Sequence, residues 1–221
     1  TQGWRDLTSP VQGTSLADWQ NDGVVFSGFP NSDFPGFIYN GAVWSNAYTY
    51  DESVVGASNL GWTVPSDITD PTGPDNGFRI YMNNTNFTLS VSGVPYTGDK
   101  EINLSLTGAS DNENGWNLVG NPYPSTIRWS AISKTGIENN YWVYDGASGN
   151  YKDFNNEIGL GSAGDFIPSS QAFWVHATSS TSKLSFSEND KSADDLPITK
   201  SSLVSSSMRI KISSQVNSYY D

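Results

Sequence analysis

An internal duplication is the feature of this sequence that most constrains its fold. Residues 3–10 (GWRDLTSP) match residues 115–122 (GWNLVGNP), and each shared tryptophan or proline lies 112 residues before its counterpart. Residues 78–82 (FRIYM) match residues 173–177 (FWVHA) at a spacing of 95, and the matches keep the same order along the chain. Self-similarity of this kind predicts one structural unit that is built twice.

The spacing between the two copies changes along the chain, which indicates an insertion. Trp19 matches Trp129 at a spacing of 110, whereas Tyr50 matches Tyr144 at a spacing of 94. The first copy therefore holds 16 additional residues. We expect the stretch 51–62 to be part of this insertion.

The local patterns within both copies are those of β-strands. Apolar and polar residues alternate in residues 102–106 (INLSL) and 209–212 (RIKI). A period of two residues places one face of a strand on a core and the other in water. Turn dipeptides such as Asn-Gly and Asp-Gly separate the runs. We predict an all-β chain of two tandem, internally repeated antiparallel β-sandwich units, jelly-roll-like, that span residues 1–108 and 109–221.

The composition excludes several classes of site and partner. The 221 residues include no cysteine and a single histidine, which removes disulfides, cysteine-ligated metals and thiol nucleophiles. There are 11 Lys and Arg against 23 Asp and Glu, for a net charge of −12. Nucleic acids and anionic membranes attract basic residues, so neither is an expected partner. No apolar run approaches the length that spans a bilayer, and we expect no membrane insertion.

The single histidine, His176, is the only one that a Ser-His-Asp triad could use. It matches Tyr81 in the first copy. A position that accepts either Tyr or His suits a half-exposed, amphipathic surface. We therefore expect His176 to have a structural role.

Three stretches of the second copy resemble a known group of proteins: residues 115–129 (GWNLVGNPYPSTIRW), 141–146 (YWVYDG) and 171–175 (QAFWV). They resemble segments of large secreted and surface proteins of Bacteroidetes, which are typically exported by the type IX secretion system. The resemblance implies an extracellular location or one on the outer cell surface. It brings no catalytic residues with it.

Aromatic rings are the sharpest candidates for a binding site. Sugars stack their apolar faces on exposed rings, and β-sandwiches present such rings on loops or on one sheet face. The aromatic residues in variable or polar surroundings are Trp44, Tyr48, Trp62, Trp142 and Tyr151. A polysaccharide or surface glycan is the expected ligand if these rings are exposed, and packing under loops is the alternative.

Calcium is the metal ion that the sequence favours. Asp67, Asp70 and Asp75 lie close together in the sequence, and Ca²⁺ prefers hard oxygen ligands. The spacing of these residues does not fit an EF-hand, so a solvated acidic loop is the alternative. No other cofactor is expected.

The function predicted from these observations is not catalytic. A glycosidase needs only two carboxylates, but no pair stands out among the 23 acids. We predict a non-catalytic extracellular module of a larger secreted or surface-anchored bacterial protein, with a structural or adhesive role and in contact with neighbouring domains. The alternative is a carbohydrate-binding module, which would present a row of exposed aromatic rings on one face.

Overall fold

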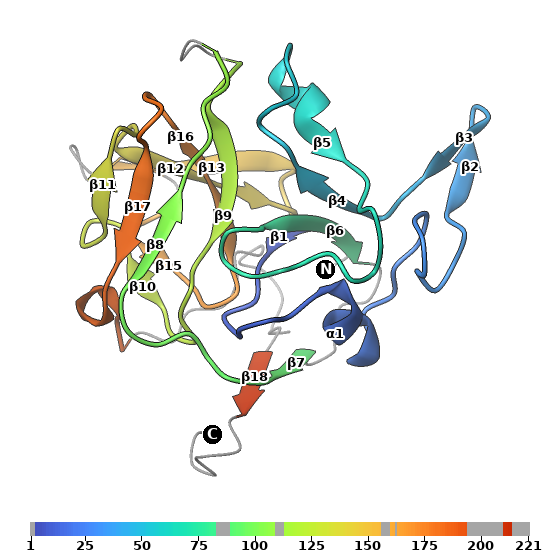
Figure 1. Ribbon diagram of the computed structural model, residues 1–221, viewed down its shortest axis with the longest axis horizontal. Helices are drawn as coiled ribbons and strands as arrows, with labels where there is room; N and C mark the ends of the chain where they lie inside the picture. Colours follow the sequence, from blue (N-terminus) through green and yellow to red (C-terminus); the bar gives the residue numbers. More distant parts are fainter. Residues whose placement is uncertain are drawn as a thin grey trace.

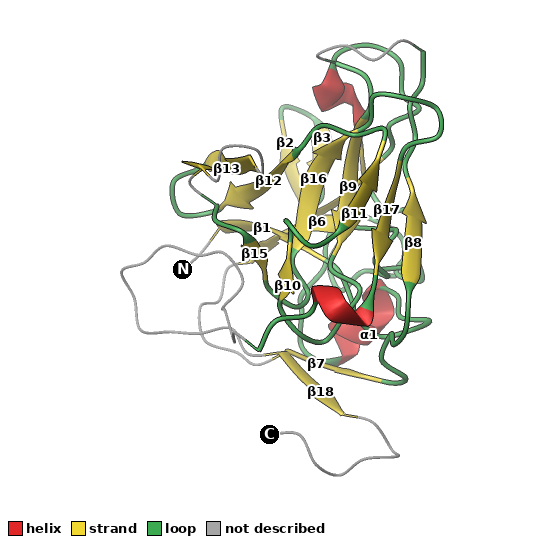
Figure 2. Ribbon diagram, turned by 90° about the vertical axis from the view of Figure 1, so that its left-hand side faces the viewer, coloured by secondary structure: helices red, strands yellow, loops and turns green. Residues whose placement is uncertain are grey.

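The computed structural model describes residues 3–82, 89–108, 113–155, 160–161, 163–193 and 210–213. This part of the chain is predominantly β and forms several antiparallel sheets (Figure 2). Its α-helix, α1 (Leu16–Asn21), is short. The prediction of an all-β chain is confirmed at this level. Within the same ranges, no helix is long and apolar enough to cross a membrane.

The first main sheet is antiparallel and comes from the first copy of the duplication. Its strand order is β1–β6–β4–β5. The strands are β1 (Gly3–Leu7), β6 (Phe78–Met82), β4 (Ala47–Tyr50) and β5 (Trp62–Thr63). Between β1 and β6, Trp4 pairs with Tyr81 and Leu7 pairs with Phe78.

The second main sheet repeats this arrangement with one additional strand. Its order is β9–β16–β12–β13–β14, and all of its strands are antiparallel. The strands are β9 (Trp116–Gly120), β16 (Ala172–His176), β12 (Asn140–Asp145), β13 (Asn150–Asn155) and β14 (Leu160–Gly161). Trp116 pairs with His176 and Val119 pairs with Phe173. The residues that match in sequence therefore occupy the same register in both sheets.

The agreement continues into the next strands of each sheet. Tyr48 pairs with Arg79 between β4 and β6, and their counterparts Trp142 and Trp174 pair between β12 and β16. One strand further out, Tyr50 pairs with Trp62 as Tyr144 pairs with Tyr151. The duplication is thus expressed in strand order and in register.

Each main sheet packs one face on its own apolar core. In the first core, the rings of Trp19 and Phe78 meet edge to face with centroids 5.4 Å apart. In the second core, the matching rings of Trp129 and Phe173 also meet edge to face, at 6.0 Å. Trp19 is carried by α1 (Leu16–Asn21), which begins with a capping box at Ser15, a motif that satisfies free N–H groups of the first turn.

The chain passes from the first core to the second before the predicted boundary at residue 108. Strand β8 (Lys100–Asn103) pairs with β17 (Lys183–Phe186), whose other neighbour is β11 (Ser133–Thr135). Ile102 and Leu104 belong to the second core, because they follow β8 into this three-stranded sheet. The boundary between the two predicted domains stays a prediction.

Smaller elements complete the described chain. Strand β18 runs parallel to β7, and β10 runs antiparallel to β15. These elements, with two 3₁₀ helices, are β7 (Leu89–Ser92), β18 (Ile210–Ser213), β10 (Ile127–Arg128), β15 (Phe166–Ile167), η1 (Ser58–Gly61) and η2 (Glu188–Asp190).

A projecting hairpin lies within the segment that holds the additional residues of the first copy, between Trp19 and Tyr50. Its strands are β2 (Phe37–Tyr39) and β3 (Ala42–Trp44), which form a two-stranded sheet of their own at the right-hand edge of Figure 1. The expectation that residues 51–62 belong to the 16-residue insertion was wrong. That stretch follows Tyr50 and joins β4 to β5, whereas the additional residues lie before Tyr50.

Candidate functional site

The faces of the two main sheets that point away from the cores pack against each other. Trp174 of the second sheet lies 4.6 Å from Tyr50 and 5.3 Å from Trp62 of the first sheet, measured between ring centroids. The guanidinium carbon of Arg79, in the first sheet, lies 4.3 Å from the ring centre of Tyr144 and 5.5 Å from that of Tyr151. Arg79 and Trp174 occupy matching positions in the two sheets. Each packs on two aromatic rings of the other half: Trp174 on Tyr50 and Trp62, and Arg79 on Tyr144 and Tyr151.

This contact overturns the expectation that the second face of each sheet lies in water. The alternating pattern of a strand marks two different faces but does not say what covers the more polar one. In this chain the other half of the duplication covers it. Most of the rings that alternation places on the solvent side are consequently used in packing.

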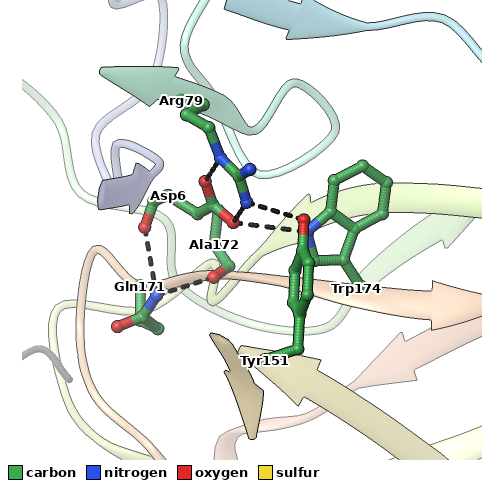
Figure 3. Close-up of polar contacts among 6 residues, drawn as sticks. All are labelled: Asp6, Arg79, Tyr151, Gln171, Ala172 and Trp174. Carbon is green, nitrogen blue, oxygen red and sulfur yellow. Dashed lines mark hydrogen bonds and ion pairs between the residues drawn. The ribbon is translucent and has the colours of Figure 1, made fainter. Parts of the chain in front are cut away.

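A buried ion pair lies at the centre of the contact, as Figure 3 shows. Arg79 Nε donates to Asp6 Oδ1 at 2.6 Å and Nη2 donates to Oδ2 at 2.8 Å. The Asp6 carboxylate is fully buried. Across the interface, Trp174 Nε1 donates to Asp6 Oδ2 at 3.2 Å, and Arg79 Nη2 donates to the Tyr151 hydroxyl at 2.9 Å.

Burial lowers the pKa of the Arg79 guanidinium, but the hydrogen bonds and the charge of Asp6 outweigh this effect, and the net shift is upward. The Arg79 guanidinium therefore stays charged. Nearby, the side-chain nitrogen of Gln171 donates to the backbone carbonyls of Asp6 and Ala172 at 3.0 and 2.7 Å. These hydrogen bonds join protein groups of the two halves to one another, so the cluster has a structural role at the interface.

Backbone hydrogen bonds also join the two halves, and they come from matching positions of the two copies. Thr8 N–H donates to the Ser170 carbonyl at 3.0 Å, and the matching Gly120 N–H donates to the Pro74 carbonyl at 2.8 Å. Thr8 and Gly120 also meet each other, because a Cβ on Gly120 would lie 2.2–2.4 Å from three side-chain atoms of Thr8. The two halves approach so closely here that only glycine fits.

Sequence reasoning missed Arg79 and Asp6 as key residues. A signal was available, since the second copy has Trp174 and Leu118 at these two positions. Two adjacent positions of a duplicated sheet that change together from apolar to oppositely charged residues indicate an ion pair.

Four of the five predicted glycan-contacting rings contribute to internal packing. Trp62 and Tyr151 belong to the aromatic pairs that receive Trp174 and Arg79. Tyr48 packs on Trp4 at 5.8 Å, and Trp142 packs on Trp116 at 4.9 Å. The sequence could not separate these rings from free ones because both kinds follow the same alternation.

The fifth residue, Trp44, lies on the projecting hairpin and is exposed. Phe37 is its cross-strand partner, with ring centroids 6.3 Å apart and planes only 20° from parallel. Tyr39 contacts Trp44 edge to face at 6.4 Å. The exposed fractions of Phe37, Tyr39 and Trp44 are 58%, 60% and 45%. We call these three residues the aromatic face of the hairpin.

The three predicted calcium ligands have separate sets of protein partners. Asp67 accepts hydrogen bonds from Thr69 and from Asn31, and these lower the pKa of its carboxyl. Asp70 accepts two from Ser66. Asp75 pairs with the ammonium of Lys100 at 2.7 Å. Among the described residues, no three His, Cys, Asp or Glu side chains gather as a metal-binding group. Calcium stays a prediction, which a melting temperature insensitive to EDTA would contradict.

His176 is buried, and the expectation of a half-exposed position was wrong. Its Nδ1 lies 2.9 Å from Glu138 Oε1 and its Nε2 lies 2.8 Å from the Asn114 carbonyl oxygen. The ring centre lies 4.8 Å from that of Trp116, as Tyr81 lies 5.3 Å from Trp4 in the first half. The residue pairs differ in chemistry but keep the same packing.

Comparison with known proteins gives no family for this chain: no family model, no curated protein and no solved structure matches it.

Proposed function

We propose that this chain is a non-catalytic module of a larger secreted or surface-anchored bacterial protein, and that its role is adhesive. The observation that carries the proposal is the β2–β3 hairpin. It projects exposed apolar side chains from a body whose other aromatic residues largely pack against one another. A cluster of exposed apolar side chains on a soluble protein typically marks a site of interaction.

The body is proposed to be two β-sandwich-like units joined face to face. The matching strand order and registers of the two main sheets support this interpretation, as do the two separate cores. Such a body would hold the hairpin in a fixed orientation relative to neighbouring domains of the parent chain. A structural spacer would need the same fixed geometry.

The proposal contains no catalytic step because the buried carboxylates have structural partners. Asp6 binds Arg79, and Asp145 binds Lys152 at 2.9 Å. Glu52 accepts hydrogen bonds from the backbone N–H groups of Thr107 and Gly115, each at 2.8 Å. A carboxylate held in this way is poorly placed to exchange protons with a substrate.

An extracellular location is part of the proposal. Its support is the resemblance of residues 115–129, 141–146 and 171–175 to surface proteins of Bacteroidetes. Export by the type IX system is the route that this resemblance implies.

A second candidate function, carbohydrate binding, is favoured by the chemistry of the aromatic face. Phe37, Tyr39 and Trp44 form the row of exposed rings that distinguishes a glycan-binding module from a plain spacer. If the module binds carbohydrate, the surface to which it adheres is a polysaccharide.

The adhesive role can be tested by trimming the hairpin. A variant in which residues 37–44 are replaced by a two-residue Asn-Gly turn is immobilised on beads beside the unmodified protein. Retention of the beads is measured on surfaces coated with polysaccharide, with protein and with phosphatidylcholine. The proposal predicts retention on at least one surface, which the trimmed variant loses at an unchanged melting temperature. Equal retention of both proteins, or no retention of either, would refute it, as would release of reducing sugar from the polysaccharide.

A further inference from the structure

We propose that the aromatic face of the β2–β3 hairpin binds a neutral polysaccharide. This inference rests on the adhesive role proposed above and names its ligand class. Five aromatic residues are exposed among the described side chains, and four of them lie between residues 34 and 44. The fifth, Tyr151, is bound through its hydroxyl to Arg79. The exposed rings are therefore concentrated on one projecting element.

The geometry of the rings suits a sugar chain. Strand alternation places Phe37, Tyr39 and Trp44 on one face, where the stacked rings of Phe37 and Trp44 and the neighbouring ring of Tyr39 form one exposed apolar surface. Pyranose rings present flat C–H faces that stack on such surfaces, while their hydroxyl groups remain in water. Tyr39 adds a hydroxyl beside the stacked rings that can donate to or accept from a sugar.

The absence of charge in this segment indicates a neutral ligand. Residues 34–50 contain no Asp, Glu, Lys, Arg or His, and they are flanked by Asp33 and Asp51 in a chain of net charge −12. Nucleobases also stack on aromatic rings, but their phosphates require basic neighbours. Acidic polysaccharides and anionic lipids are disfavoured for the same reason.

Hydrogen bonds and a close backbone approach fix the base of the hairpin to the body. Asn46 accepts a hydrogen bond from Ser27 N–H at 2.8 Å and donates one to the Val25 carbonyl at 2.7 Å. A Cβ on Gly36 would lie 2.6 Å from the Trp44 carbonyl oxygen, so the two strands leave the body in close contact. A surface that is fixed before binding loses little conformational entropy when the ligand arrives.

A lipid or protein partner fits this hairpin less well. In a bilayer core, the unpaired backbone groups of a two-stranded sheet would lose water without replacement. A stable protein interface uses roughly 20–30 residues on each side, whereas β2 and β3 supply three residues each. A polysaccharide needs only one face and leaves the strand edges hydrated.

The opposite face of the same hairpin supplies a matched control. Ile38 and Val43 are cross-strand partners on that face, with exposed fractions of 77% and 58%. A partner that surrounds the hairpin would use these side chains as much as the rings. A polysaccharide on the aromatic face would not use them.

The test is affinity electrophoresis of the whole chain in gels that contain xyloglucan, galactomannan or laminarin, with alginate as an acidic control. We expect retardation in at least one neutral gel and none in alginate. Phe37→Ala and Trp44→Ala should each weaken binding at least tenfold, while the double variant Ile38→Ser/Val43→Ser should bind within twofold of the unmodified protein.

Three outcomes would overturn the inference: no retardation in any neutral gel, retardation in alginate alone, or equal losses for variants of the two faces. If beads are nevertheless retained on protein or phosphatidylcholine and the trimmed variant is not, the adhesive role stands and only the ligand class fails.

Discussion

The two main sheets meet through matching positions that have opposite chemistry. In the first sheet, Asp6 and Arg79 are cross-strand neighbours. In the second, the same two positions hold Leu118 and Trp174. The difference makes the two faces complementary: Arg79 stacks on tyrosines of the second half, and the Trp174 N–H binds the Asp6 carboxylate. If arginine stood at position 174 as well as at position 79, two like charges would meet at the interface.

Comparing the Asp6–Arg79 pair with the Leu118–Trp174 pair separates two roles of a buried pair: stabilising the fold and fixing the alignment of the two faces. A buried ion pair is often no more stabilising than apolar side chains of similar size, because both charges lose their water. The Leu118–Trp174 pair shows that the fold accepts an apolar alternative at this position. We interpret the Asp6–Arg79 pair as a device that fixes how the two faces align.

The largest effect is expected from removing one member of that pair. Arg79→Ala leaves the Asp6 carboxylate buried without its cation, and it should lower the free energy of unfolding by about 3–5 kcal/mol. Urea denaturation monitored by tryptophan fluorescence measures this change. The double variant Asp6→Leu/Arg79→Met, which removes both charges so that the pair is apolar as in the second sheet, should be more stable than Arg79→Ala. A double variant that is less stable than the single one would contradict the comparison.

The next effect concerns the point where the halves touch. Gly120→Ala places a methyl group against Thr8, and overpacking of this kind costs about 1–3 kcal/mol. Thr8→Gly removes the opposing atoms, so adding Gly120→Ala to that variant should cost much less. The measurement is a double-mutant cycle of unfolding free energies. Strict additivity would show that the two residues do not meet.

A moderate effect on stability is expected at alkaline pH, from Tyr50 at the interface and from Tyr141 in the second core. Burial, and after it the charge of Glu52, raises the pKa of Tyr50 to about 12, against an unfolded value of about 10. The unfolded chain therefore loses its proton first. The resulting stability is present below pH 10 and is lost as the pH rises from about 10 through 12. Burial raises the pKa of Tyr141 in the second half in the same direction.

The variant Tyr50→Phe separates this contribution from the rest. It removes the hydrogen bond from the hydroxyl to the Ser58 carbonyl, at a cost of about 1 kcal/mol near neutrality. Its melting temperature should then fall less steeply between pH 9 and 11 than that of the unmodified protein. Parallel pH profiles would show that Tyr50 does not titrate differently in the folded state.

The smallest effect is expected outside the interface. Phe37→Ala and Trp44→Ala remove exposed cross-strand contacts and should each change stability by less than about 1 kcal/mol. Trp174→Ala removes the same kind of ring from the interface and should cost about 3–5 kcal/mol. Thermal unfolding of the three variants compares them directly. Equal losses would mean that the hairpin belongs to the folded body.

Part of the candidate site could be predicted from local sequence, and part could not. Trp44 was identified because its surroundings are polar, and the structure places it on an exposed hairpin. Phe37 and Tyr39, which lie beside Trp44, were not among the predicted rings. Trp62, Trp142 and Tyr151 were chosen by the same criterion as Trp44. Trp62 packs on Trp174 and Tyr151 packs on Arg79, and in both cases the partner comes from the other copy, far away in the sequence. Trp142 packs on Trp116 of its own copy.

The sequence by itself determined that this chain is built of β-strands and that its two copies share strand order and register. Both follow from local alternation and from matched residues such as Trp4 and Trp116. Only the tertiary structure decided that the outer faces of the copies cover each other and that β8 joins the second core. The physical reason is that alternation records two faces of each strand, while the surface that buries a face is supplied by distant parts of the chain.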